Sequence, residues 1–314
     1  MTPPRRILIA EPKGFSQAAI QVLEGLGEVF LLDLPKENLK EALAAYDVFW
    51  CRLRFQIGAT DLPENPRCRY IVCPVTGLDH IDLEACASKG IQVLSLRGET
   101  TFLNTVRATA ELTLGLTLAL LRKLPGAVDH VREGGWDRDP FQGRELWGKT
   151  VGIAGMGRLG KITAQYFRAF GCKVLGFDPA PFEEPGVTPC QSLENLVEQA
   201  DIVSIHINYT PESHHLFNEA LFSTFKQGSV LVNTARGALV DSLALLRCLE
   251  SGHLSGAALD VIENEQAHQN SPLVAFAREH NNLIITPHIG GNTMESFEKT
   301  ECFMAEKLKA ALAS

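Results

Sequence analysis

The sequence predicts an α/β protein with two doubly wound domains, each built on a parallel sheet. Short apolar runs alternate with helical patterns along nearly all of the 314 residues, and this alternation is typical of a parallel sheet. One long segment at 123–148, rich in Gly, Pro, Trp and charged residues, separates two groups of strands. A chain of this length commonly forms about two domains.

Composition and charge narrow the class of protein. Apolar residues make up 45% of the chain and charged residues 21%, which is ordinary for a globular protein. The net charge is −8 and there is no basic tract, so we expect no nucleic-acid partner. The longest apolar stretch, 112–121, is too short to cross a bilayer, and no basic-then-apolar leader follows Met1. We therefore expect a cytoplasmic protein with no membrane partner.

The cysteines and histidines indicate no metal centre. None of the eight cysteines forms a C-x-x-C pair, and most lie in or beside apolar segments, so we expect reduced and mostly buried thiols. His214 and His215 are adjacent in the sequence. We expect them to point in different directions on the surface and not to bind a metal.

The first group of elements predicts a complete small domain without a glycine fingerprint. Its strands are expected at 5–10, 29–32, 47–51, 70–73 and 91–94. Helices are expected at 18–26, 39–45 and 82–89, and a long helix at 104–124. The segment 123–148 is too long for a turn, and we interpret it as an arm that packs on another surface, such as a second subunit.

The second group of elements begins at Thr150. Its strands are expected at 151–154, 173–177, 202–206, 230–233, 256–259 and 283–285. Helices between them include 192–199 and 242–251, and a last helix is expected at 294–313.

A glycine fingerprint opens the second domain. Gly155, Gly157 and Gly160 follow an apolar strand with the spacing G-x-G-x-x-G and open a helix. Three glycines alone are weak evidence, but the next strand ends at Asp178, 18 residues beyond Gly160. This order is typical of a Rossmann dinucleotide-binding unit, with the pyrophosphate at the helix N-terminus. A carboxylate at Asp178 can accept hydrogen bonds from the ribose and would repel a 2′-phosphate, so NAD is favoured over NADP.

Three further polar residues follow successive strands of the same domain. Arg236, Glu265 and His288 come shortly after the strands expected at 230–233, 256–259 and 283–285. Ligands of open α/β sheets bind beyond the carboxyl ends of the strands. Each residue alone could be structural: a solvated arginine, a surface acid or a hydrogen-bonded histidine. Their joint appearance after successive strands favours an active site.

Four motifs extend this pattern over nearly the whole chain. They are GKTVGI at 148–153 leading into GMGRLG, NTARG at 233–237, Asp260-Val261 with Glu265, and TPHIGG at 286–291. With them the chain resembles the D-isomer-specific 2-hydroxyacid dehydrogenases. The resemblance implies an NAD-dependent homodimer in which a Rossmann domain, residues 99–289, is inserted in a flavodoxin-like substrate domain, residues 1–98 and 290–314.

The resemblance also implies a role for each site residue. Arg236 would bind the substrate carboxylate and polarise the carbonyl, His288 would exchange a proton with the carbonyl oxygen, and Glu265 would orient His288. The loop Val75-Thr76-Gly77 would hold the substrate carboxylate through its N–H groups. Further cofactor contacts would come from Arg158, Leu159, His206, Thr210, Thr234, Ala235, Asp260 and His288.

Departures from the family pattern concern the substrate. The proline often found two residues after His206 is absent, since Asn208 stands there, and Gln266 replaces the usual proline after Glu265. The connection 94–104 is longer than in common members and adds Arg97 and Glu99.

In the phosphoglycerate members an arginine of the first-domain loop meets the phosphate. We therefore expect Arg54, together with Arg97, to meet a second anionic group. The alternative is that Arg52 and Arg54 are a pair of surface arginines. A phosphoglycerate- or hydroxypyruvate-like substrate is favoured.

A competing function exists for the same fold. An NAD(H)-sensing protein resembling the corepressors of this fold would keep the same three residues and catalyse nothing. Only 26 residues follow His288, so we expect neither a regulatory domain nor extra segments for partner docking.

Overall fold

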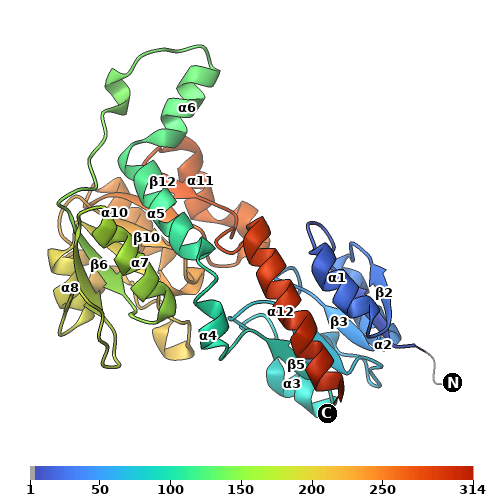
Figure 1. The fold of residues 1–314 in the computed structure, drawn as a ribbon. Helices are drawn as coiled ribbons and strands as arrows, with labels where there is room; N and C mark the ends of the chain where they lie inside the picture. Colours follow the sequence, from blue (N-terminus) through green and yellow to red (C-terminus); the bar gives the residue numbers. More distant parts are fainter. Residues whose placement is uncertain (1–3, 314) are drawn as a thin grey trace. The chain divides into compact units, whose positions relative to one another are not determined.

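The computed structural model describes residues 4–313, which form two compact units (Figure 1). The first unit holds residues 4–106 and 292–313, and the second holds 107–291. The boundaries expected from the sequence, 98/99 and 289/290, lie eight and two residues away from these. Within the described residues, no helix is long and apolar enough to span a membrane.

The first unit has a five-stranded parallel sheet in the order β2-β1-β3-β4-β5. This is the flavodoxin-like order of a doubly wound sheet. Its strands are β1 (Arg6–Ile9), β2 (Glu28–Leu31), β3 (Val48–Trp50), β4 (Tyr70–Cys73) and β5 (Gln92–Ser95). Its helices are α1 (Gln17–Glu24), α2 (Leu39–Ala45), α3 (Leu83–Ser88), α4 (Thr100–Leu103) and α12 (Met294–Ala313), with 3₁₀ turns η1 (Lys36–Asn38) and η2 (Ala59–Asp61).

Alternation along the strands builds two cores, one on each face of this sheet. Ile7 and Ile9 of β1 pack on one face with α1 and α12, whereas Leu8 packs on the other face with α2 and α3. Figure 1 shows the last helix, α12, lying beside α1. The C-terminal segment therefore completes the first unit.

The second unit has a seven-stranded parallel sheet in the order β12-β11-β10-β9-β6-β7-β8. Read from β8, the first six strands follow the Rossmann order 3-2-1-4-5-6, and β12 adds an edge strand. The strands are β6 (Thr150–Ala154), β7 (Lys173–Phe177), β8 (Val187–Pro189), β9 (Ile202–Ile205), β10 (Ser229–Asn233), β11 (Leu254–Leu259) and β12 (Leu283–Ile285). The two doubly wound parallel sheets predicted from the sequence are confirmed.

Helices cover both faces of the second sheet. One face carries α5 (Ala108–Leu121) and α7 (Arg158–Ala169). The other carries α8 (Leu193–Gln199), α9 (Glu219–Thr224), α10 (Ser242–Glu250) and α11 (Pro272–Glu279). Three 3₁₀ turns lie in loops after the strands: η4 (Pro211–Ser213), η5 (Gly237–Leu239) and η6 (Glu265–Asn270).

The long helix expected at 104–124 is present but shorter, because α5 begins at Ala108 and ends at Leu121. A turn at 104–107 separates it from α4, which lies before the expected range. There Thr105 Oγ1 donates to the carbonyl oxygen of Phe102, and Val106 N donates to that of Leu103. These bonds end the first helix, and the boundary between the two units falls at this turn.

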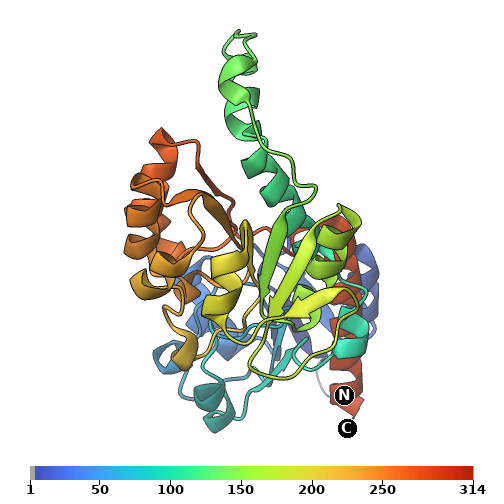
Figure 2. The same ribbon diagram turned by 90° about the vertical axis from the view of Figure 1, so that its left-hand side faces the viewer.

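The segment 123–148 projects from the second unit (Figures 1 and 2). It begins at Lys123 with φ 52° and contains α6 (Leu124–Arg132) and the turn η3 (Asp139–Phe141). Two tryptophans of the segment, Trp136 and Trp147, are 90% and 76% exposed. The segment therefore leaves two large aromatic side chains uncovered.

Candidate active site

The predicted site residues of the second unit lie along one edge of its sheet. Each follows the carboxyl end of a different strand, and the strands are parallel neighbours. In spatial order from β7 to β12, these residues are Asp178, Gly155, His206, Arg236, Glu265 and His288. The glycine fingerprint and the three catalytic candidates therefore share the edge where doubly wound sheets bind ligands.

The three glycines of the fingerprint have three different environments. Gly155 has φ 97°, and a Cβ there would lie 2.6 Å from the carbonyl oxygen of His206. A Cβ on Gly160 would lie 2.0 Å from the carbonyl oxygen of Gly155. Gly157 faces open space and caps α7 at its N-terminus. This opening at the N-terminus of α7 fits a dinucleotide pyrophosphate.

Asp178 is fixed beside this glycine loop. Its Oδ2 accepts a hydrogen bond from Met156 N at 2.8 Å, and its Oδ1 accepts one from Ala180 N at 2.9 Å. Each carboxylate oxygen has a second lone pair, which leaves acceptors for ribose hydroxyls.

His206 ends the next strand along the edge. It is half-buried, and its Nε2 lies 2.8 Å from Ser204 Oγ. Burial lowers the pKa of His206 to about 4, so the ring is neutral near pH 7. Burial also lowers the pKa of Arg158 at the start of α7. Thr210 lies in an exposed loop further on.

The turn that carries Arg236 is built around a buried asparagine. Asn233 Oδ1 accepts from Ala235 N at 2.9 Å, and its Nδ2 donates to the carbonyl oxygen of Arg236 at 2.9 Å. Arg236 itself is half-buried, and its Nη1 donates to the carbonyl oxygen of Ala235 at 2.8 Å. Thr234, two residues before Arg236, is buried, and its Oγ1 lies 2.8 Å from Thr113 Oγ1.

His288 and Glu265 form a direct pair. Nδ1 of His288 lies 2.9 Å from Oε2 of Glu265. The side chains are 26% and 40% exposed, so the pair is reachable from solvent. Because Glu265 occupies Nδ1, Nε2 is the ring nitrogen that can exchange a proton with a substrate.

Asp260 shapes the turn that presents His288. Its carboxylate is 1% exposed and accepts from Thr286 Oγ1 at 2.6 Å, Ile289 N at 2.8 Å and Gly290 N at 2.7 Å. Its carbonyl oxygen accepts from His288 N at 2.9 Å. We expected Asp260 to contact the cofactor, and the sequence did not indicate this structural role.

Arg54, the first arginine predicted for the substrate, lies in the first unit, after β3. Arg54 Nη1 donates to Asp33 Oδ1 and, at 3.2 Å, to the carbonyl oxygen of Leu34. A second carboxylate, on Glu11, lies 3.8 Å from Arg54 Nε. Arg54 is therefore already neutralised by two acids.

Arg52 has a structural role in the same unit. It forms an ion pair with the buried Glu301 of α12, and its guanidinium carbon lies 4.0 Å from the ring centroid of Phe297. The pair of surface arginines considered for this loop is wrong for Arg52, which ties the loop to the last helix.

The loop Val75-Thr76-Gly77 follows β4 in the first unit. Val75 N donates to the carbonyl oxygen of Cys73 at 2.8 Å, and Leu96 N donates to that of Val75 at 3.0 Å. The next residue, Arg97, is exposed. The connection after β5 therefore runs directly beside the predicted carboxylate loop.

The chain was then compared with known proteins. Residues 114–290 match the family described as "D-isomer specific 2-hydroxyacid dehydrogenase, NAD binding domain". The chain belongs to this family.

Relatives in this family have several named activities. The chain is 34% identical to D-3-phosphoglycerate dehydrogenase of Methanocaldococcus jannaschii over 98% of its own length and 57% of that enzyme's. It is 36% identical to glyoxylate reductase of Thermofilum pendens over 88% of the chain and 81% of the relative. The chain thus spans somewhat more than half the length of the phosphoglycerate dehydrogenases it matches.

A solved structure of the family supports the fold in detail. D-lactate dehydrogenase of Aquifex aeolicus, complexed with NAD and lactic acid, superposes with a TM-score of 0.81 at 29% identity. The match covers 98% of this chain and 95% of that one. The fold of the family is therefore present in both units.

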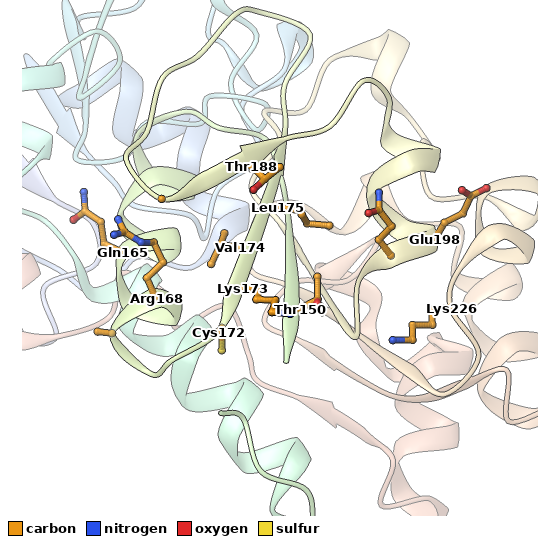
Figure 3. A pocket seen from close by; sticks show the side chains of 13 residues that line it. Thr150, Gln165, Arg168, Cys172, Lys173, Val174, Leu175, Thr188, Glu198 and Lys226 are labelled. Atoms are coloured by element: carbon orange, nitrogen blue, oxygen red, sulfur yellow. The ribbon is translucent and has the colours of Figure 1, made fainter. Parts of the chain in front are cut away.

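A polar pocket of about 980 Å³ lies elsewhere in the second unit (Figure 3). Its lining includes Thr150 and Lys173, the first residues of β6 and β7, together with Arg168, Glu198 and Lys226. These strand starts lie at the opposite edge of the sheet from the catalytic candidates. This pocket therefore contributes nothing to the active site described above.

The directions expected for His214 and His215 are wrong. Their rings do not point apart but stack, with centroids 3.9 Å apart and an interplanar angle of 19°. The cause is the left-handed backbone of His215, with φ 50°, which turns its side chain back toward that of its neighbour. Glu263 lies beside them, and one ligand atom from each of the three lies within 4.8 Å of the others.

Proposed function

We propose that the protein is an NAD-dependent dehydrogenase that interconverts a D-2-hydroxy acid and its 2-keto acid. The observation that carries this proposal is the His288–Glu265 pair, 2.9 Å apart. Glu265 follows β11, which lies between β12, the strand before His288, and β10, the strand before Arg236. The glycine loop lies on the same edge. This arrangement supports proton exchange and dinucleotide binding at one edge, as hydride transfer to a carbonyl requires.

The chemistry divides between the bound cofactor and the side chains. The nicotinamide, when bound, supplies or accepts the hydride. Arg236 binds the substrate carboxylate and polarises the adjacent carbonyl. His288 donates a proton from Nε2 to the carbonyl oxygen in reduction and accepts it in oxidation. Glu265 accepts a hydrogen bond from Nδ1–H of His288, which fixes the orientation of the ring.

The preference for NAD over NADP rests on Asp178. Its carboxylate is fixed beside the glycine loop by two backbone N–H groups. Ribose hydroxyls can donate to this carboxylate, whereas a 2′-phosphate would meet like charge.

The proposed substrate is a phosphoglycerate- or hydroxypyruvate-like acid, and of these the phosphoglycerate-like one carries a second anionic group, its phosphate. The named phosphoglycerate dehydrogenases among the relatives support this class. Arg97 is the better candidate to meet that group, because Arg54 is neutralised by Asp33 and Glu11. Steady-state kinetics of Arg54→Ala and Arg97→Ala decide between them. Replacing the responsible arginine should raise KM for a phosphorylated acid and leave KM for glyoxylate unchanged.

We also propose a homodimer that uses the segment 123–148. Its exposed Trp136 and Trp147 give it the apolar surface that a subunit contact needs. Sedimentation of the protein and of a Trp136→Ser variant tests this, and a monomeric wild-type protein would contradict it.

The activity is tested with a panel of 2-keto acids and either NADH or NADPH. The expected result is oxidation of NADH by at least one keto acid, and little with NADPH. A control variant is His253→Gln, since His253 stands just before β11, at the sheet edge opposite the proposed site, and its ring bonds Gln227 and the carbonyl oxygen of Phe222. If NADH binds but no keto acid is reduced, the protein is instead an NAD(H)-sensing binding protein of this fold.

A further inference from the structure

Glu263 joins three segments of the second unit through one half-buried carboxylate. Its Oε1 lies 2.7 Å from Nε2 of His215, in the loop after β9. Its Oε2 accepts from Oγ of Ser242, the first residue of α10, at 3.3 Å. Glu263 itself stands two residues before Glu265. Its carboxylate therefore ties the Glu265 segment to two neighbouring elements.

The segment between these two acids needs such an anchor. Asn264 lies between them in the left-handed conformation, with φ 52°. This conformation is disfavoured for residues with a side chain, although Asn tolerates it better than most. Without a fixed residue on its N-terminal side, the peptide could relax and move the Glu265 carboxylate.

His215 also contacts the segment that carries Arg236. Its backbone N donates to the carbonyl oxygen of Ala238, two residues after Arg236, at 2.9 Å. The same residue thus contacts one catalytic segment through its backbone and the other through its ring.

The two catalytic segments touch each other at Gly237. A Cβ there would lie 2.0 Å from the carbonyl carbon of Ile262 and 2.4 Å from Glu263 N. The backbones are packed so closely that a shift of one segment must be transmitted to the other.

We propose that His215 and Glu263 are positioning residues, which together fix Glu265 relative to Arg236. We call this pair the latch. It touches neither cofactor nor substrate in the proposed site, and acts only through those two residues. The inference rests on the proposed function and deepens it, because Glu265 can orient His288 only if its own segment is held.

A metal ion bound by His214, His215 and Glu263 is the alternative for this cluster. Metal binding needs nitrogen lone pairs that converge on one point. The His214 and His215 rings are stacked at 3.9 Å and nearly parallel, so their lone pairs run side by side. The hydrogen-bonded latch therefore accounts better for the observed geometry.

The test compares His215→Ala, Glu263→Ala and His215→Gln with His214→Ala. Gln at 215 can still donate to Glu263, and His214 has the same stacked position without a bond to Glu263. We expect His215→Ala and Glu263→Ala to lower kcat by about 10- to 100-fold, as misplacement of catalytic groups does. KM for the keto acid and Kd for NADH should change less than about threefold, since the glycine loop lies elsewhere on the sheet edge.

Rescue and coupling separate positioning from general damage. His215→Gln should recover most of kcat, His214→Ala should resemble wild type, and the double variant His215→Ala/Glu263→Ala should be no worse than either single variant. Hydrogen exchange should rise in 236–240 and 261–266 in His215→Ala but not in His214→Ala. This last readout needs no turnover, so it tests the latch even if the proposed activity fails.

Two results would overturn the latch. One is unchanged kcat and unchanged exchange in both His215→Ala and Glu263→Ala. The other is loss of activity on treatment with a chelator and in His214→Ala, with recovery on adding Zn²⁺ to the chelated enzyme, which would establish the metal site instead. Absence of turnover in the wild-type protein would contradict the proposed function alone.

Discussion

The buried carboxylate of Asp260 holds the turn on which His288 stands. His288 has φ 53°, and the two residues after it donate their N–H groups to Asp260 at 2.8 and 2.7 Å. The position of the proposed proton donor is therefore set by an acid buried behind it, and Glu265 then selects the ring orientation.

Replacing Asp260 with Ala should damage both stability and turnover. Three donors would lose a charged acceptor in a buried site, and a hydrogen bond to a charged group contributes about 1.5–3 kcal/mol. We expect the free energy of unfolding in urea to fall by at least about 3 kcal/mol, and kcat of the remaining folded protein to fall as well. Unchanged unfolding together with unchanged kcat would contradict this role.

Gly157→Ala should weaken cofactor binding, whereas Gly160→Ala should lower stability. An added methyl at Gly157 meets open space, so the free energy of unfolding should change by less than about 1 kcal/mol. The same methyl would block the pyrophosphate and weaken NADH binding at least about tenfold. At Gly160 the methyl would press on the carbonyl oxygen of Gly155 and cost about 1–3 kcal/mol of stability. Thermal unfolding and NADH titration of both variants measure the contrast. Equal NADH affinity in wild type and Gly157→Ala would rule out this site for the pyrophosphate.

His206 should make the protein less stable in mild acid. Its pKa in the folded protein is lowered to about 4 by burial, against about 6.5 in an unfolded chain. The unfolded state therefore binds more protons between these values, and stability is lost as the pH falls from about 6.5 to about 4. In His206→Asn, we expect this acid-induced loss of stability to be smaller by on the order of 2 kcal/mol. Denaturant titrations of wild type and His206→Asn at pH 7.5 and 4.5 measure this difference. Equal losses of unfolding free energy in the two proteins would show that other groups are responsible.

Asp178→Ala should relax the cofactor preference. Without the carboxylate, the repulsion of a 2′-phosphate disappears, and the hydrogen bonds to ribose are lost. The ratio of kcat/KM for NADH over NADPH should fall at least about tenfold. Asp178→Asn is the matched control for lost charge, because its amide oxygen can still accept from Met156 N. A ratio unchanged in both variants would show that the preference lies elsewhere.

Much of the fold follows from features that are local in the sequence. The apolar runs at 70–73, 173–177 and 283–285 became β4, β7 and β12 with the expected ends, because buried parallel strands are continuously apolar. The strand at 187–189 was missed. It has three residues, includes Pro189 and lies at the sheet edge, so it has none of these signals.

Other features depend on contacts that no local pattern shows. The break between α4 and α5 has neither Gly nor Pro, and its turn is stabilised by Thr105 and Val106. The stacking of His214 on His215 follows from a left-handed backbone at His215. The motifs predicted Arg236, Glu265 and His288, but their supports at Asn233, Asp260 and Glu263 required the structure, because each bonds groups brought together only by folding.

The most direct test of the account is turnover by His288→Ala and Glu265→Gln beside wild type, with NADH, a reducible 2-keto acid and chiral analysis of the product. Wild type should form the D-2-hydroxy acid. His288→Ala should lose at least about 100-fold in kcat, as loss of a general acid does, while NADH affinity stays within about threefold of wild type. Glu265→Gln should fall between the two. Formation of the L-isomer, or full turnover by His288→Ala, would contradict the central claim.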